Sequence, residues 1–252
     1  MQSYSMQWTI RPIHCDPAGF VRIGAIQDFL QETAGEHCLL LGCDIPTLQQ
    51  KGFSWVITRF ELRMQAYPHA GETVTVRTTA HKPRLCFFPR SFSVERADGT
   101  VLGTAYSLWL PIDVETRSMA APGTISDVLP GDADAKEPFH LSVRSAYPTE
   151  TAVLCDTVSF TPRYTDLDAN GHMNNARYTD LACNILGIDT MERNLIQSIS
   201  VLYDREILPG QTVLVKHVKD GDTHYLSATA QDRPEGKPAF EITVKTVPVT
   251  GV

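Results

Sequence analysis

The densest group of chemically capable side chains lies in one short segment. It reads Asp166-Leu167-Asp168-Ala169-Asn170-Gly171-His172-Met173-Asn174-Asn175-Ala176-Arg177-Tyr178. Carboxylate, amide and imidazole groups at alternate positions could take a proton from water and stabilise a developing oxyanion. The same residue types also suit a turn before a helix, with Asn174 or Asn175 as its cap and His172 exposed. A cap needs one such side chain, so the crowding favours a functional site at a helix N-terminus, whose amides attract negative charge.

Two predicted helices would position these residues. Apolar residues recur with a helical period over 23–41, which Gly42 ends, and over about 174–186, which Gly187 ends. The second segment is apolar on several sides, which is typical of a helix buried nearly all round. Alternating patterns and turn signals predict strands elsewhere. Their expected ranges are 53–64, 73–80, 86–96, 101–112, 195–203, 212–218, 225–231 and 239–247.

The two halves form an internal repeat. A shift of 152 places Asp16 on Asp168 and Gly19 on Gly171, and after the helices a shift of 139 aligns Gly71 with Gly210. Each half has a strand, a long helix and four antiparallel strands. We therefore predict an α+β protein with a tandem, or double, hotdog fold, each half a long buried helix wrapped by an antiparallel sheet. The expected domains are 1–113 and 152–252, and 114–151, rich in Pro, Gly, Ala, Ser and Asp, is the expected linker.

Composition and charge exclude several protein classes. The 252 residues carry a net charge of −7, which argues against a nucleic-acid partner. No apolar run reaches the ~20 residues of a membrane span, and no signal or transit pattern is present, so we expect a cytoplasmic protein. The six cysteines lack metal-binding spacing and are expected to be reduced and buried. Motifs for serine hydrolases, zinc proteases and nucleotide binding are absent, and no metal or cofactor is expected.

The segment from Asp166 to Tyr178 resembles the D-x-D-x-N-x-H-x-N-N-x-x-Y signature of acyl-acyl-carrier-protein (acyl-ACP) thioesterases, the plant fatty-acid-releasing type and its bacterial relatives. Two further stretches, 30–42 and 55–62, are similar to the first-half helix of that family and its next strand. The resemblance spans about residues 7–248 of the chain. It implies hydrolysis of acyl-ACP to free fatty acid and holo carrier protein, which ends fatty acid synthesis.

The resemblance also implies the site residues. The catalytic set of the family falls on Asp168, Asn170, His172 and Glu206. Many plant members carry Cys directly after the Glu, whereas this chain has Ile207, so no thiol nucleophile is expected there. The implied mechanism is direct attack by water. Either Asp168 or Glu206 would take the proton, helix amides with Asn170 or His172 would hold the oxyanion, and His172 would donate to the leaving thiolate.

The first half departs from this pattern, because Ala18 and Phe20 stand where the second half has Asn170 and His172. Its Asp16 loop resembles that of hydroxybenzoyl-CoA thioesterases, so a second site is conceivable. We expect instead a degenerate half that supplies part of the acyl pocket.

The implied partner is the acidic acyl carrier protein with its phosphopantetheine-linked acyl chain, and a homodimer is compatible with this interpretation. Lys82, Arg84 and Arg90 are the candidate docking residues, although they could also be an ordinary solvated hairpin edge. An acyl-CoA thioesterase on the same fold and a non-enzymatic acyl-binding module are the alternatives.

Overall fold

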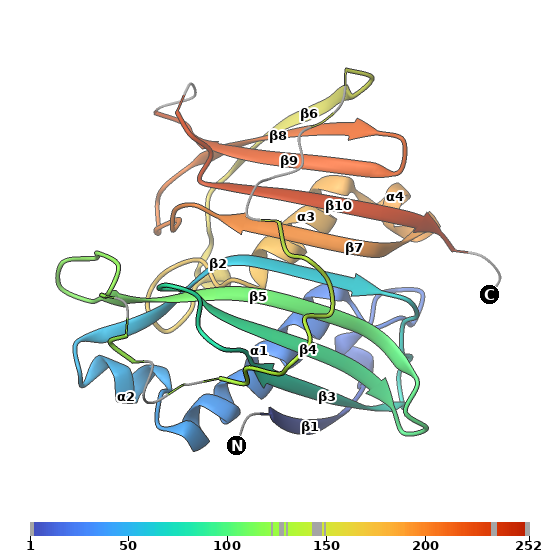
Figure 1. Ribbon diagram of the computed structural model, residues 1–252. Coiled ribbons are helices and arrows are strands. Elements are labelled where there is room, and N and C mark those ends of the chain that lie inside the picture. The colour runs from blue at the N-terminus through green and yellow to red at the C-terminus, as the bar shows by residue number, and fades with distance from the viewer. Residues whose placement is uncertain are drawn as a thin grey trace. The chain divides into compact units, whose positions relative to one another are not determined.

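A computed structural model describes residues 3–121, 123–125, 129, 131–142, 148, 150–232 and 236–249 of the chain (Figure 1). The chain divides into two compact units, Met1–Leu141 and Ser142–Val252. The division falls inside the expected linker 114–151, part of which lies outside the described residues. Each unit is described separately below.

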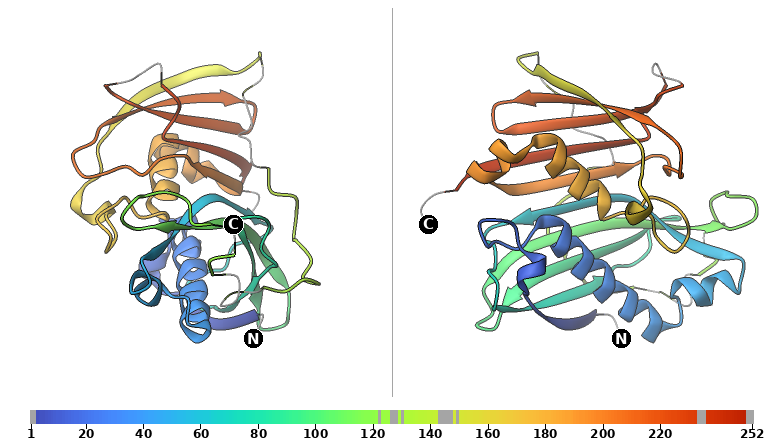
Figure 2. Two further views of the ribbon diagram at one scale, coloured as in Figure 1. Left: turned by 60° about the vertical axis from the view of Figure 1, so that its left-hand side comes forward. Right: turned by 180° about the vertical axis from the view of Figure 1, so that it is seen from behind.

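The first unit contains a five-stranded antiparallel sheet with the order β1-β3-β4-β5-β2. The helix α1 lies across one face of this sheet, as the right-hand view of Figure 2 shows, and contacts β1 and β3. A 3-10 turn, η1, precedes α1 and the short helix α2 follows it. The elements are β1 Ser3–Thr9, η1 Pro12–His14, α1 Ile23–Leu41, α2 Ile45–Gln49, β2 Phe53–Met64, β3 Thr73–Ala80, β4 Phe88–Arg96 and β5 Val101–Asp113.

The helix α1 has the predicted bounds, 23–41. Its apolar stripe, which includes Ile26, Leu30 and Ala34, is buried as the sequence period indicates. The helix ends because Gly42 adopts a left-handed conformation, with φ of 69°, that other residues avoid. Three polar side chains, Gln27, Thr33 and His37, are also buried on α1, so its buried surface is wider than an apolar stripe.

The second unit has the corresponding sheet order, β6-β8-β9-β10-β7, and is also antiparallel. Here α3 lies beside β7 (Figure 2). Its buried residues include Tyr178, Leu181 and Ala182, and Asn184 alone on this helix is exposed, which agrees with the predicted extensive burial. The elements are β6 Val153–Phe160, η2 Tyr164–Asp166, α3 Arg177–Leu186, α4 Ile188–Arg193, β7 Asn194–Tyr203, β8 Val213–Asp220, β9 Thr223–Ala230 and β10 Phe240–Pro248.

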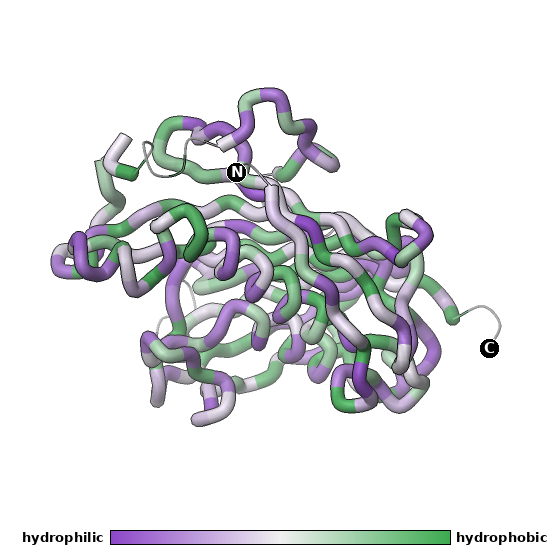
Figure 3. The backbone as a smooth tube through the Cα atoms, turned by 90° about the horizontal axis from the view of Figure 1, so that it is seen from below, coloured by the Kyte–Doolittle hydropathy of each residue, from purple (hydrophilic) through white to green (hydrophobic). Residues whose placement is uncertain are grey.

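The eight predicted strands are all present. The bounds of β2 and β3 match the prediction, and the other strands differ by one or two residues at their ends. Burial alternates along β3, β9 and β10, and hydrophobic and hydrophilic residues are interleaved along the chain (Figure 3). The helix predicted from 174 begins at Arg177, because 174–176 form a turn. The short helices α2 and α4 were not predicted.

All six cysteines are free thiols, but their expected burial is wrong for most of them. Cys43 is buried, Cys155 is exposed, and the other four are partly buried. In the described part of the chain, no helix is both long enough and apolar enough to cross a membrane.

Candidate active site

The Asp168 loop, residues 166–172, is a compact turn between η2 and α3. Asp168 Oδ1 accepts hydrogen bonds from the amides of Asn170, at 2.8 Å, and His172, at 3.2 Å. The Asp168 amide in turn donates to the His172 carbonyl at 2.8 Å. Gly171 completes the turn with φ of 76°. The aspartate therefore shapes the loop with one oxygen, and within the described residues its Oδ2 makes no hydrogen bond.

His172 and Glu206 lie together although 34 positions separate them in the sequence. The two are brought together by a backbone hydrogen bond from the Met173 amide to the Ile207 carbonyl, 3.1 Å long. His172 Nε2 is 3.6 Å from Glu206 Oε2, and the two side chains are 22% and 34% exposed. This separation is long for a hydrogen bond but suits a pair that tightens around a substrate. Water or a substrate can therefore reach both groups.

The sequence led us to expect that the amides at the start of α3 would be free to hold an oxyanion. The structure differs from this expectation. Asn174 caps the turn, since its Oδ1 accepts from the Ala176 amide at 2.8 Å and its carbonyl accepts from the Arg177 amide at 2.9 Å. The Thr179 amide donates to the Ala176 carbonyl at 3.1 Å. Since these amides already have partners, most of the helix N-terminus is not available to a substrate oxygen.

Tyr178 is a neighbour of the site for which the sequence suggested no role. It is buried on α3, and its ring makes edge contacts with Tyr203 and Phe240, both at 5.0 Å between centroids. Burial raises the pKa of the Tyr178 hydroxyl, and the Glu206 and Asp168 carboxylates act in the same direction. The hydroxyl therefore stays neutral beside both carboxylates. The sequence signals for it were its place at the end of the D-x-D-x-N-x-H-x-N-N-x-x-Y signature and its position in an otherwise apolar helix.

The Asp16 loop, residues 14–20, repeats the backbone of the Asp168 loop in the first unit. Asp16 Oδ1 accepts from the amides of Ala18 and Phe20, both at 3.0 Å, and the Asp16 amide donates to the Phe20 carbonyl at 2.8 Å. The Val21 amide donates to the Pro68 carbonyl at 3.0 Å, as the Met173 amide does to that of Ile207. The residue shifts of 152 and 139 predicted from the sequence therefore align hydrogen bonds of the first unit with equivalent hydrogen bonds of the second.

The side chains on the two loops differ where the chemistry would occur. Under the same shifts, Phe20 corresponds to His172 and Tyr67 to Glu206. The rings of Phe20 and Tyr67 meet edge to face, with centroids 6.4 Å apart, and Tyr67 is only 8% exposed. The first unit therefore has an aromatic contact at the place where the second unit has the His172–Glu206 pair.

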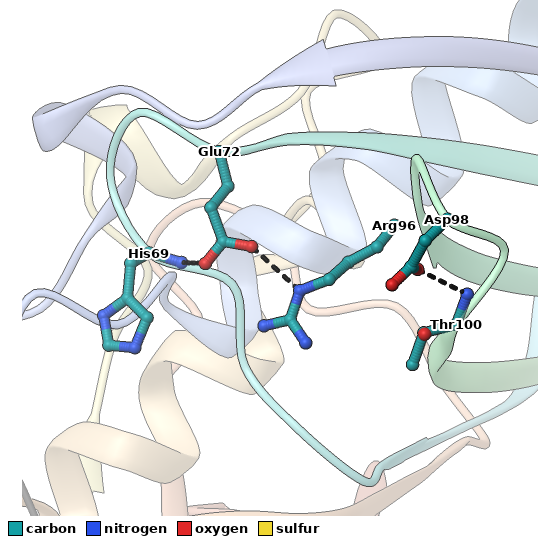
Figure 4. A network of polar contacts seen from close by, with 5 residues as sticks. All are labelled: His69, Glu72, Arg96, Asp98 and Thr100. Atoms are coloured by element: carbon teal, nitrogen blue, oxygen red, sulfur yellow. Dashed lines mark hydrogen bonds and ion pairs between the residues drawn. The ribbon is translucent and has the colours of Figure 1, made fainter.

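The turn after Tyr67 also has a counterpart in the second unit. Figure 4 shows Glu72 accepting from the His69 amide and from Arg96 Nε, both at 2.9 Å. In the second unit, Gln211 Oε1 accepts from the Leu208 amide at 2.9 Å. The turn that follows Glu206 is thus held by a neutral side chain in place of a carboxylate.

The three candidate docking residues have different environments. Lys82 and Arg84 are exposed, and Arg84 forms an ion pair with Glu137. Arg90 is only 4% exposed, so its prediction as a docking residue is wrong. Its guanidinium donates to His37 Nδ1, Thr78 Oγ1 and Cys38 Sγ inside the first unit. A charge enclosed in this way cannot contact a partner protein. No group of three or more His, Cys, Asp or Glu side chains suited to a metal ion occurs among the described residues.

Comparisons with known proteins identify the family of the chain. The acyl-ACP thioesterase N-terminal domain model matches residues 1–123, and the corresponding C-terminal domain model matches 154–245. A chloroplastic palmitoyl-acyl carrier protein thioesterase of Gossypium hirsutum is 25% identical over 219 residues, which cover 81% of this chain and 52% of that protein. A chloroplastic dodecanoyl-[acyl-carrier-protein] hydrolase of Cinnamomum camphora is 26% identical over 79% of this chain and 55% of its own length. The chain thus spans about half the length of these curated relatives.

Two solved structures share the fold. An acyl-ACP thioesterase from Bacteroides thetaiotaomicron is 23% identical and has a TM-score of 0.84, with 97% of this chain and 98% of that chain covered. The 12:0-ACP thioesterase from Umbellularia californica is 21% identical and has a TM-score of 0.82, with 98% and 97% covered. These similarities, with the antiparallel sheets and few helices, establish a hotdog-type fold. Since the two family models together match most of the sequence, the chain belongs to the acyl-ACP thioesterase family.

Proposed function

We propose that this protein hydrolyses acyl-ACP to a free fatty acid and holo carrier protein, and so ends fatty acid synthesis. The family match supports this assignment, as do the names of the relatives. The observation that carries it is the contrast between the two loops. One backbone pattern occurs twice, and the second unit alone combines it with Asn170, His172 and Glu206.

As part of this proposal, the two units are tandem hotdogs with different roles. The shared order of elements and the repeated loop bonds support a duplicated hotdog. We assign catalysis to the half that begins at 152, and treat 1–113 as a degenerate half that contributes to the acyl pocket, with 114–151 as the linker. A long acyl chain suits an apolar pocket, since each buried methylene contributes about 0.8 kcal/mol.

The proposed mechanism uses one water molecule and no covalent intermediate. Asp168, held by its Oδ1, takes a proton from water with its Oδ2 as the water oxygen attacks the thioester carbonyl carbon. The tetrahedral intermediate then collapses, the carbon–sulfur bond breaks, and the phosphopantetheine sulfur leaves as the thiol after it gains a proton. Glu206 orients the His172 ring, which supplies that proton.

We assign the oxyanion to the side-chain amide of Asn170, because the first amides of α3 already have partners. Loss of a single oxyanion donor typically costs a factor of about 10²–10³ in turnover. Asn170→Ala should therefore lower the turnover number strongly, while Asn174→Ala should act mainly on the stability of the turn.

Lys82 and Arg84 remain the proposed docking residues for the carrier protein, since both are exposed and cationic. An acidic carrier would approach this strongly acidic chain through such a local basic surface. We keep the cytoplasm as the proposed location and a homodimer as the arrangement to be tested by light scattering. The chloroplastic location belongs to the named plant relatives.

A thiol-release assay tests the proposed function against its alternatives. One acyl chain is presented on the carrier protein and on coenzyme A, and initial rates are compared over a panel of chain lengths. We expect release from both, with a higher kcat/KM for the carrier form. A higher kcat/KM for acyl-CoA would favour the acyl-CoA thioesterase. Tight retention of the acyl ligand without thiol release would identify an acyl-binding module and refute hydrolysis.

A further inference from the structure

Two cysteines lie together where α1 ends. The Cys43 amide donates to the Cys38 carbonyl at 2.9 Å, and the Gly42 amide donates to that of Leu39 at 3.1 Å. These two bonds, with Gly42 left-handed, define a Schellman motif. In this motif the side chains that flank the turn pack against each other, and here both are thiols. Cys43 is fully buried, and Cys38 packs on the same apolar cluster, which includes Leu48 and Phe88.

The buried guanidinium of Arg90, on β4, faces this pair. Its Nη2 donates to Cys38 Sγ at 3.3 Å, and its Nη1 donates to His37 Nδ1 at 3.0 Å and to Thr78 Oγ1 at 3.1 Å. An arginine stays charged in a protein and can only donate, so His37 Nδ1 must accept and carries no proton. Of the three groups, Cys38 alone can become an anion. A buried cation requires such a counter-charge.

The surrounding charges favour ionisation of Cys38. The hydrogen bond from the Cys43 thiol lowers the pKa of Cys38 to about 6, and Arg90 acts in the same direction, against burial and the Asp44 carboxylate. The pKa of Cys43 is raised for the complementary reason, because its thiol donates that bond and is buried. These shifts favour the thiolate form of Cys38 beside the Cys43 thiol, and a thiolate next to a second cysteine can be oxidised through a sulfenic acid to a disulfide.

We propose that Cys38 and Cys43 form an oxidation site for hydroperoxides, separate from the thioester-hydrolysing residues. The Cys38 thiolate attacks the terminal oxygen of the hydroperoxide, the O–O bond breaks, and Cys38 becomes a sulfenic acid while the alkoxide takes up a proton. The Cys43 thiol then loses its proton, and its sulfur attacks that of Cys38. The S–O bond breaks, and hydroxide leaves as water. Two thiols and one hydroperoxide thus give a disulfide, one alcohol and one water.

The disulfide would change the environment of Arg90. Oxidation removes the only anion among its three partners and leaves a buried guanidinium facing neutral groups. We therefore expect the oxidised protein to unfold at a lower temperature than the reduced one. The change would be located in the first unit, where α1, α2 and β4 pack around the cluster.

Hydrogen peroxide and peptide mapping of the full-length protein test the proposal. Trypsin releases residues 23–51 as one peptide that contains both cysteines and no internal Lys or Arg. After peroxide treatment at neutral pH, this peptide should lose the mass of two hydrogen atoms and regain it on reduction. In Cys43→Ser, dimedone should label Cys38 as a trapped sulfenic acid, and in Cys38→Ser, Cys43 should stay unmodified. Absence of the internal disulfide in the wild-type peptide would overturn the proposal.

A second measurement tests the role of Arg90 without relying on oxidation. The rate of iodoacetamide labelling of Cys38 is followed against pH by mass spectrometry, with exposed Cys155 in the same sample as a matched control. We expect a midpoint near 6 for Cys38 in the wild type, and a rise of about 1–3 pH units in Arg90→Gln. If Arg90→Gln fails to fold, the labelling profile of the wild type still shows whether Cys38 is ionised at neutral pH. Labelling of Cys38 that follows the profile of Cys155 would contradict the thiolate.

Discussion

Asp168 and Asp16 offer a matched pair for separating chemistry from loop structure. Each carboxylate accepts two backbone amide bonds, at 2.8 and 3.2 Å for Asp168 and at 3.0 Å twice for Asp16. Replacement by Ala removes both bonds. Bonds to a charged acceptor are worth about 1.5–3 kcal/mol each when buried, and both loops are partly exposed, so we expect a loss of about 2–3 kcal/mol in the free energy of unfolding at either position.

Asparagine keeps an acceptor oxygen in the same place, so it should cost only about 1 kcal/mol at each position. Turnover should separate the two residues sharply. Asp168→Asn removes the proposed base and should lower kcat by about 10²–10⁴. Asp16→Asn should leave kcat unchanged, because Phe20 and Tyr67 stand at the positions that His172 and Glu206 occupy in the second unit.

The measurements are urea unfolding followed by circular dichroism and initial rates of thiol release from acyl-ACP. Equal stability losses with unequal turnover would support the assigned roles. The reasoning is refuted if Asp168→Asn keeps near-normal turnover, or if Asp16→Asn loses as much as Asp168→Asn. The second outcome would mean that the first unit holds a working site.

Three further predictions concern the His172–Glu206 pair, the exposed Lys82 and Arg84, and the buried His224. His172→Gln and Glu206→Gln should lower kcat by similar factors. The double variant should have the same kcat as either single variant, since the two residues act as one unit. Additive losses of kcat would show that the two residues act independently. Reversing charge at Lys82 and Arg84 should raise KM for acyl-ACP but not for acyl-CoA, with Lys216→Glu as the exposed control; an unchanged KM would dismiss this docking surface. Burial lowers the pKa of His224 to about 4, below the value of about 6.5 expected when unfolded, so the unfolded state binds more protons between these values. Stability should therefore fall by about 2–3 kcal/mol from pH 7 to 4.5 in urea unfolding, and His224→Phe should reduce this fall.

Much of the secondary structure could be predicted because strong local signals bound it. Gly42 ends α1 at the expected residue, and the alternation along β3 agrees with its observed burial. The short helix α4 could not be recognised, since six residues hold too few helical repeats to produce a period. The start of α3 was misplaced because Asn174 caps a turn that precedes the helix.

The candidate site was predictable only in part. The crowding of Asp, Asn and His residues in the Asp168 loop itself indicated a functional site. The approach of Glu206 to His172, in contrast, depends on the Met173–Ile207 backbone hydrogen bond, which no local sequence pattern reveals. Arg90 was misassigned for a related reason. A cation on a predicted strand is normally solvated, but Phe88, Pro89 and Arg90 are all buried, which breaks the usual alternation.

The aromatic contact between Phe20 and Tyr67 has a consequence for protein engineering. The first unit already has the backbone of the Asp168 loop, so under the proposed function a second hydrolytic centre would require Ala18→Asn, Phe20→His and Tyr67→Glu rather than a new fold. The obstacle is solvent access, because Tyr67 is 8% exposed whereas the Glu206 side chain is 34% exposed. A glutamate at position 67 would be largely buried and would favour its protonated form. Under the proposed function, the exposure of the side chain at position 67 would therefore limit such a design as much as the identity of the three substituted residues.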